Sequence, residues 1–506
     1  MPVTPIYTRR KPEEGILYDA VCQEWPKLCA ASKAANDGKG LPNFIEDAVH
    51  DYLECGVLKH GFLYAKCDQC KESTVVAFSC KQRGICNSCD GKRMIALGAQ
   101  LVDSVIPAVK VRQWVITFPH DIRYLLAWNH DFRTAVLAAV MRALERHYIV
   151  QARNKGGKNP KFAGVSVMQR MDQTCRLNVH WHILCTDGAW VETEKGVQFL
   201  QAPPLKQPVL EAVFADILKR VDRQIAKLPD PLEDPAETQR TCDPALSMLL
   251  RNAMLGFQSD GKDMGKPQQV EFGKGPIKIR KDGRNCCMSN GYSLHANRTI
   301  APLDREGLEK LCRYLCRPAV AASRLELVDN PVGNKTIRIH LKTEFEGGVK
   351  SVLISKMDLV IRALAQIPLP FRKQIVYHGC FAGNSKLRPQ VVLAGDKPKA
   401  RRKKSKTEPD ENTKMLWRDA HLRCFGWDVL KCPCGGTRTL IAAVKKKTEI
   451  ERFLRHLKLW PEADEVVSVT GPPEAFDFDE IERQEEWDDF YESQEQITAD
   501  AENWAA

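Results

Sequence analysis

The sequence contains two pairs of cysteines whose spacing is typical of a metal site. Two residues separate the members of each pair, and the four cysteines are Cys67, Cys70, Cys86 and Cys89. This spacing lets both sulfurs of a tight turn reach one tetrahedral ion, and a second such turn completes the coordination. The pairs therefore predict one structural Zn²⁺ site, and four unbound thiols are the alternative. For Cys55 and Cys80 we favour buried packing over a ligand role.

A pair of histidines separated by one apolar residue forms a second candidate site. In a strand over residues 177–185 the side chains alternate, so His180 and His182 project from the same face, about 7 Å apart along the strand. Two imidazoles on one face can bind one divalent cation. The alternative is a pair of hydrogen-bonded histidines without a metal.

The residues around Tyr314 form a third candidate site. An apolar stripe in residues 308–315 predicts a helix that leaves Lys310 and Tyr314 one turn apart on a neighbouring face, with Arg313 and Arg317 nearby. A phenol beside guanidinium groups and a metal can attack a phosphodiester, while the arginines hold the phosphate and the metal draws charge from it. The alternative for a helical tyrosine is packing alone.

Hydrophobic periodicity predicts the elements that would position these side chains. Predicted strands cover 111–118, 162–169, 177–185, 336–342 and 350–354, and predicted helices cover 42–53, 131–149 and 308–315. The strands at 162–169 and 177–185 flank Asp172 and Gln173, which predicts a hairpin. We therefore expect a mixed α and β domain, interrupted by a polar, Pro- and Gly-rich insertion near 228–290.

The net charge of +11 is distributed unevenly along the chain. Residues 461–506 hold 16 Asp and Glu against one Arg, a net charge of −15, so residues 1–460 carry +26. A body this basic predicts a polyanionic partner, and nucleic acid is the first candidate. No apolar run approaches the roughly 18 residues of a membrane span, and the first residues lack the apolar core of a secretory signal. We therefore expect a cytoplasmic protein without a membrane partner.

These features divide the chain into six predicted segments. They are an N-terminal arm (1–40), a zinc-binding DNA-recognition domain (41–100), a catalytic domain with the insertion (101–395), a basic linker (396–412), a small C-terminal module (413–460) and an acidic tail (461–506). We expect the module to be rich in α-helix and the tail to be disordered. The module contains Cys432 and Cys434, to which no second zinc site is assigned because only one residue separates them.

Six short segments carry a family resemblance by their content and their order. They are FSCKQRGICNSC (78–89), WVITFP (114–119), RYLLAW (123–128), HWH (180–182), LCRY (311–314) and YHG (377–379). Together they resemble the rolling-circle transposases of the insertion-sequence ninety-one type and their common-region relatives, over about residues 40 to 460. The resemblance implies an α+β fold in which a helical zinc-binding domain precedes an antiparallel-sheet HUH (His-hydrophobe-His) nuclease domain. The histidines would lie on a central strand and the nucleophile on a nearby helix.

The resemblance also implies roles for individual residues. His180 and His182 would bind the catalytic metal, Tyr314 would be the nucleophile, and the four paired cysteines would bind zinc. The third metal ligand in this class is commonly Gln, Glu or Asp, and we select Gln169 on the adjacent predicted strand. Lys310 stands where two-tyrosine members carry their first tyrosine, which favours a single-tyrosine reaction.

We therefore expect a metal-dependent tyrosine endonuclease and strand transferase. It would cleave and rejoin single-stranded DNA at transposon ends through a 5′-phosphotyrosine intermediate, using structural Zn²⁺ and catalytic Mg²⁺ or Mn²⁺. A plasmid or phage replication initiator or a relaxase of the same chemistry is one alternative. The order of the motifs weighs against a relaxase, in which the nucleophile usually precedes the histidines. A zinc-containing DNA-binding regulator without catalysis is the alternative of a different class.

Overall fold

The fold was analysed in a computed structural model, which describes residues 11–228, 243–255, 279–281, 285–329, 335–345, 349–392, 428 and 430–460. The acidic tail, the basic linker and most of the predicted insertion lie outside the described residues. The prediction of an α+β fold with antiparallel sheets is confirmed.

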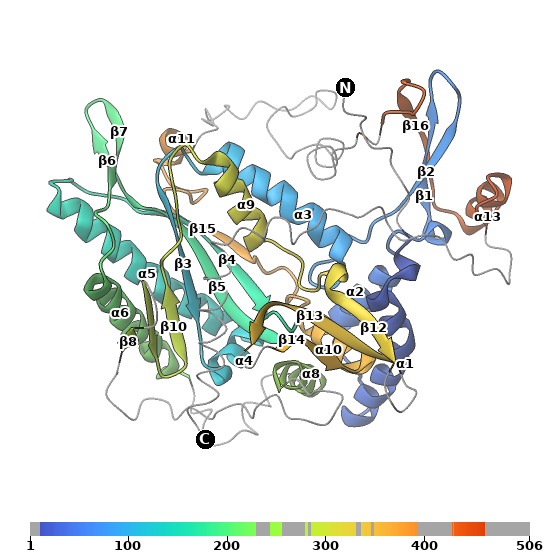
Figure 1. The fold of residues 1–506 in the computed structure, drawn as a ribbon, viewed down its shortest axis with the longest axis horizontal. Coiled ribbons are helices and arrows are strands. Elements are labelled where there is room, and N and C mark those ends of the chain that lie inside the picture. The colour runs from blue at the N-terminus through green and yellow to red at the C-terminus, as the bar shows by residue number, and fades with distance from the viewer. Residues whose placement is uncertain are drawn as a thin grey trace.

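An eight-stranded sheet forms the centre of the molecule (Figure 1). Its order is β15-β4-β5-β3-β10-β9-β8, β11 also pairs with β3, and the neighbours are antiparallel. The strands are β3 (Val111–Thr117), β4 (Ala163–Met171), β5 (Leu177–Thr186), β8 (Arg280–Lys281), β9 (Cys286–Ser289), β10 (Tyr292–His295), β11 (Thr299–Ile300) and β15 (Ile375–Gly379). Strand β5 is therefore an interior strand, hydrogen-bonded to β4 on one side and to β3 on the other.

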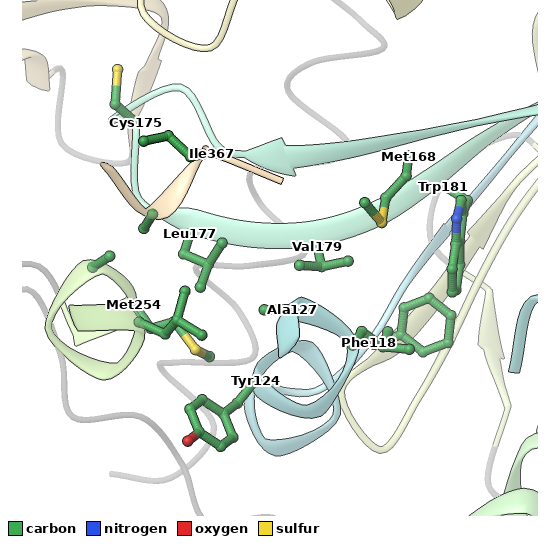
Figure 2. Packing of buried hydrophobic residues seen from close by; sticks show 14 of the residues in the cluster. Phe118, Tyr124, Ala127, Met168, Cys175, Leu177, Val179, Trp181, Met254 and Ile367 are labelled. Carbon is green, nitrogen blue, oxygen red and sulfur yellow. The ribbon is translucent and has the colours of Figure 1, made fainter. Parts of the chain in front are cut away.

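Side chains alternate along β5, so the strand has one apolar face and one face that carries the two histidines. Figure 2 shows Leu177, Val179 and Trp181 projecting from the same side of the strand toward the helix that carries Tyr124 and Ala127. That helix is α4 (His120–Trp128), and it packs in the larger core with α5 (His130–Asn154), α6 (Gln207–Ile225) and α8 (Pro244–Leu255). The even-numbered residues of β5, including the two histidines, consequently face the opposite side of the sheet.

The helix α9 (Arg305–Leu315) covers that opposite side. Leu308, Leu311 and Leu315 are buried in a second core together with Val165 and Val167 of β4. Figure 1 shows α3 (Asn87–Gln100) beside α9, and a methyl group at Gly98 would lie only 3.1 Å from the Arg313 side chain. The sheet is thus covered by helices on both faces, and α9 lies beside α3 on the face that carries the two histidines.

The remaining elements form three smaller groups. A three-stranded sheet contains β12 (Leu325–Asp329), β13 (Lys335–Phe345) and β14 (Val349–Ile354), and a two-stranded sheet contains β6 (Gly188–Thr193) and β7 (Gly196–Gln201). The third group joins β1 (Phe62–Cys67), β2 (Ser73–Ala77) and β16 (Arg438–Val444). The helices outside these sheets are α1 (Ile16–Ala35), α2 (Asn43–Glu54), α10 (Lys356–Ala365), α11 (Arg388–Val391) and α13 (Lys447–His456).

A buried arginine holds the ends of two helices against the central sheet. Arg170 of β4 donates to the carbonyl of Ala127 at 3.1 Å and to that of Ala365 at 2.9 Å. These carbonyls belong to the last turns of α4 and α10, where backbone acceptors lack partners within the helix. Burial lowers the pKa of Arg170 to about 9, so its guanidinium remains charged near neutral pH and strengthens these bonds.

A glycine fixes the loop between β2 and α3 against the end of α10. Gly84 has φ of +89°, and a methyl group there would lie 2.4 Å from the carbonyl oxygen of Gln366. The Gly84 amide also donates to Asp90 in the first turn of α3 at 2.8 Å. Only a residue without a side chain allows this backbone conformation and this close contact together.

We expect Gly84→Ala to destabilise the protein by about 2–4 kcal/mol, because it combines left-handed backbone strain with a backbone clash. The matched control is Gly383→Ala, since a methyl group at Gly383 meets no atom within 4 Å. Denaturant unfolding followed by tryptophan fluorescence measures both variants. Equal midpoints for the two variants would show that the loop is not held by this contact.

Candidate active site and metal centres

The two histidines of β5 lie together under α9. His180 and His182 are 5% and 0% exposed, and their Nε2 atoms are 3.2 Å apart. Two ligands at about 2.1 Å from one ion are separated by roughly 3.0–3.4 Å in octahedral or tetrahedral geometry. The spacing of the two nitrogen atoms therefore fits a shared divalent ion.

Hydrogen bonds to the other ring nitrogens orient both imidazoles. Nδ1 of His180 donates to the carbonyl of Asn178 at 2.9 Å, which keeps an electron pair available on Nε2. The side-chain amide of Gln113 on β3 lies 2.7 Å from Nδ1 of His182, and its Oε1 is buried without a partner. Rotating this amide by 180° would let Oε1 accept from Nδ1, so that Nε2 of His182 is also free to bind a metal.

Both histidines are neutral near physiological pH. Burial lowers the pKa of His180 to about 4 and that of His182 well below its usual value. The positive charges of Arg123 and Arg317 lower the pKa of His180 further, after the larger effect of burial. A site that combines neutral nitrogen ligands with nearby guanidinium groups suits a metal ion and a phosphate anion.

Gln169 connects the histidines to α9. It pairs directly with His180 across β4 and β5, and its Nε2 donates to the carbonyls of Tyr314 and Leu315, both at 3.1 Å. Its Oε1 is buried and has no hydrogen-bond partner. The Gln169 amide thus donates hydrogen bonds to the last carbonyls of α9, and its oxygen, which has no hydrogen-bond partner, remains available next to the histidine pair.

Tyr314 packs against the histidine pair. Its ring centroid lies 5.6 Å from that of His182, with the two planes nearly perpendicular, and the guanidinium carbon of Arg317 lies 4.5 Å from the centre of the phenol ring. Tyr314 is only 7% exposed. The structure therefore brings Tyr314, Arg317, Gln169 and both histidines together, although they come from three separate elements and the residues after α9.

The other two predicted cations are held elsewhere on α9. Lys310 forms an ion pair of 2.9 Å with Glu306, whose side chain is 81% exposed. Arg313 pairs with Glu309 at 2.5 Å and packs against Gly98 of α3. Arg313 thus lies in the contact between α9 and α3.

The cysteines form two clusters of four, each with all sulfurs within 4.8 Å of one another. The first cluster contains Cys55, Cys80, Cys86 and Cys89, with sulfur separations of 3.6–3.8 Å. Tetrahedral coordination at about 2.3 Å requires sulfurs roughly 3.8 Å apart, so the geometry fits zinc. The amides of Cys80 and Gln82 each donate to a sulfur of this cluster at 3.4 Å, as expected around thiolates.

The structure corrects the predicted grouping of the paired cysteines. Cys67 and Cys70 lie apart from Cys86 and Cys89 and cluster instead with two cysteines of the C-terminal module, Cys432 and Cys434. The reason is the β1–β2 hairpin: Cys67 ends β1 at its tip, whereas Cys86 precedes α3 at its base. Six residues of strand span about 17 Å, too far for one ion.

Sequence reasoning also missed residues that complete these sites. Cys55 and Cys80, which we expected to be packing residues, lie in the first cluster. The spacing Cys80-x5-Cys86-x2-Cys89 could have indicated that Cys80 is a ligand. Gln113 carried no local signal, because its contact with His182 depends on the register of β3 against β5.

Comparison with known proteins identifies the family. Residues 24–118 match the family model described as "Transposase zinc-binding domain", and residues 164–388 match the one described as "Putative transposase". The chain belongs to the insertion-sequence ninety-one type of transposases. No curated protein and no solved structure matches it.

The two matched regions of the transposase correspond to the two kinds of site. The zinc-binding match contains the first cysteine cluster, and the second match contains β5, Gln169 and Tyr314. As a transposase the chain acts on DNA, and its cysteine clusters support structural zinc. Within the described residues, none of the helices has the length and apolar character needed to cross a membrane.

We expect Gln113→Ala to weaken Mn²⁺ binding about 10–100-fold, because loss of an outer hydrogen bond leaves the His182 ring without orientation. Electron paramagnetic resonance of free Mn²⁺ in the zinc-loaded full chain measures the affinity, and His180→Ala with His182→Ala defines the signal without this site. Ser166→Ala is the matched control, since it removes a partly buried 2.8 Å bond to His378 from the opposite face of β4. Equal affinity for wild type and Gln113→Ala would refute the orienting role.

Proposed function

We propose that the transposase cleaves and rejoins single-stranded DNA at element ends through a covalent bond to Tyr314. The observation that carries the proposal is the position of Tyr314 over His182, next to two neutral histidines and the free Oε1 of Gln169. Nucleophile and metal ligands on one buried face are what a metal-assisted phosphodiester transfer requires. The reaction would take place on chromosomal and element DNA in the cytoplasm.

The donor set fits a divalent ion bound by His180, His182 and Gln169. An ion of the Mg²⁺ or Mn²⁺ class would polarise the scissile phosphodiester when bound there. Two nitrogens and one amide oxygen leave further coordination positions for phosphate oxygens and water. The Oε1 of Gln169 is buried and has no hydrogen-bond partner, which supports its assignment as the third ligand.

Tyr314 would attack the phosphorus through its phenolic oxygen. A bond forms between that oxygen and phosphorus while the bond from phosphorus to the 3′ oxygen breaks, which leaves a 5′-phosphotyrosine and a free 3′-OH. The phenol loses one proton and the departing 3′ oxygen gains one, so the step is balanced without an external energy source. Attack by a 3′-OH on the phosphotyrosine reverses it and rejoins the strand.

The cations near Tyr314 would have different tasks. Arg317 lies over the phenol ring and is the candidate to hold the attacked phosphate. Lys310, one helical turn before Tyr314, is the candidate for a flanking phosphate, since an exposed pair such as that with Glu306 costs at most about 1 kcal/mol to break. Arg313 would position α9 on α3, because its side chain lies in that contact.

The DNA strand would approach between the zinc-binding domain and the sheet. A pocket there is lined by Gln169 and Arg317 together with Arg93 and Leu97 of α3. We assign the structural zinc to the first cysteine cluster, which would fix the start of α3 because Cys86 and Cys89 lie there. Recognition of DNA ends by this domain and catalysis by Tyr314 would then share the contact between α3 and α9.

Tyr314→Phe should reduce formation of the covalent DNA adduct by more than about 10³-fold, because it removes the attacking oxygen. The stability should change by less than about 1–2 kcal/mol, since the ring that packs on His182 remains. Denaturing gels of labelled single-stranded element ends incubated with Mn²⁺ measure the adduct. Tyr377→Phe is the matched control, since Tyr377 also has an arginine, Arg388, over its ring.

The same assay separates the alternatives. A wild-type adduct excludes a non-catalytic DNA-binding regulator. Cleavage at a plasmid origin in preference to element ends would favour a replication initiator or relaxase of the same chemistry. An undiminished adduct in Tyr314→Phe would refute the proposed nucleophile.

A further inference from the structure

The second cysteine cluster joins two parts of the chain that are more than 360 residues apart. Cys67 and Cys434 lie 3.5 Å apart between sulfurs, as do Cys70 and Cys432, and the separations in sequence are 367 and 362 residues. A disulfide requires sulfurs about 2.05 Å apart, so the four thiols are not paired as disulfides. The four sulfurs lie within 4.8 Å of one another, as in a tetrahedral thiolate site.

The backbone around these cysteines is shaped for that arrangement. Gly435 has φ of +91°, and the amide of Gly436 donates to the sulfur of Cys434 at 3.4 Å. A methyl group at Gly436 would lie 2.7 Å from the sulfur of Cys67. The two glycines thus form a tight turn that places Cys432 and Cys434 against the hairpin tip, which compensates for the short spacing of one residue between them.

The segment that carries Cys432 and Cys434 is built onto the N-terminal hairpin. Figure 1 shows β16 beside β1, although the two strands come from opposite ends of the described chain. They pair antiparallel from Phe62 with Val444 to Cys67 with Arg438, and this strand departs from the α-rich module that the sequence predicts. The shared core is small, with six buried residues: Leu58, Phe62, Val75, Val444, Ile450 and Leu454.

We propose that Cys67, Cys70, Cys432 and Cys434 bind a second structural zinc ion that fastens the C-terminal module to the N-terminal hairpin. Four thiolates in tetrahedral spacing are the donor set that favours zinc among the common divalent ions. A core of six side chains is too small to hold a three-stranded sheet and a helix by itself, and small units of this size commonly depend on a metal.

Binding of the second zinc would stabilise the fold, whether or not Tyr314 attacks DNA. It closes the chain into a ring that contains the whole catalytic domain, and crosslinks that close long loops restrict the unfolded chain most strongly. Loss of this zinc should therefore release the module while the first cluster and the active site remain intact.

Metal analysis of the full-length chain, purified under reducing conditions, tests the proposal. Wild type should contain two zinc ions per chain, and Cys432→Ser with Cys434→Ser should contain one. Hydrogen exchange of residues 430–460 should then accelerate at least tenfold, while α3 and β5 exchange as in wild type. The matched control is Cys22→Ser with Cys29→Ser in α1, which removes two thiols outside both clusters and should retain two ions.

A measurement on wild type keeps the proposal testable if the serine variant does not fold. After brief chelation, N-ethylmaleimide should label Cys67, Cys70, Cys432 and Cys434 together, before the more buried first cluster. One zinc per wild-type chain, or two in the Cys432→Ser and Cys434→Ser variant, would overturn the proposal. Labelling of Cys67 and Cys70 together with Cys86 and Cys89, but without Cys432 and Cys434, would overturn it as well.

Discussion

The register between β4 and β5 is the constraint on which the candidate active site depends. It places Gln169 opposite His180, and strand alternation then puts His182 on the same face under α9. A slip of one residue would turn both histidines into the apolar core that packs on α4 and α5. The register is secured from both faces, because Leu177, Val179 and Trp181 are buried on the other side. The hydrophobic core thus determines where the ligands point.

Gln169 links this register to the position of Tyr314, the proposed nucleophile. Its amide nitrogen donates hydrogen bonds to the last carbonyls of α9. These bonds fix the distance between the end of that helix and the sheet. The helix also packs against α3, which begins directly after Cys86 and contains Cys89 in its first turn. Metal binding in the first cluster and the position of Tyr314 are therefore linked through two packed helices.

Local sequence patterns were sufficient to predict the strands and helices around the candidate active site. The predicted strand at 177–185 is β5, Leu177–Thr186, and the predicted helix at 308–315 lies within α9, Arg305–Leu315. Both have strong periodicity, because one side of each is buried in an apolar core. The histidine pair and Tyr314 could be selected because their neighbours in the chain set their direction. Their mutual proximity, however, required the packing of α9 on the sheet.

The metal clusters could not be predicted from spacing alone. The two pairs of cysteines are close in sequence, yet the hairpin between them separates its tip from its base. The partners of Cys67 and Cys70, Cys432 and Cys434, lie in the turn that precedes β16, and no local pattern specifies which hairpin β16 will join. Gln113 was missed for the same reason, since its role arises from pairing between strands. Local propensity predicts the individual elements, but it does not predict which distant strands will pair.

The most direct test of Tyr314 as the nucleophile is to identify the residue that carries DNA in a trapped adduct. Wild-type protein is incubated with a labelled single-stranded element end and Mn²⁺, the adduct is digested with protease, and the nucleotide-bearing peptide is sequenced by mass spectrometry. We predict that the nucleotide is attached to Tyr314, in the peptide that ends α9. Attachment to another tyrosine, such as Tyr292 or Tyr377, would contradict the assembly of metal ligands and nucleophile on one face of the sheet.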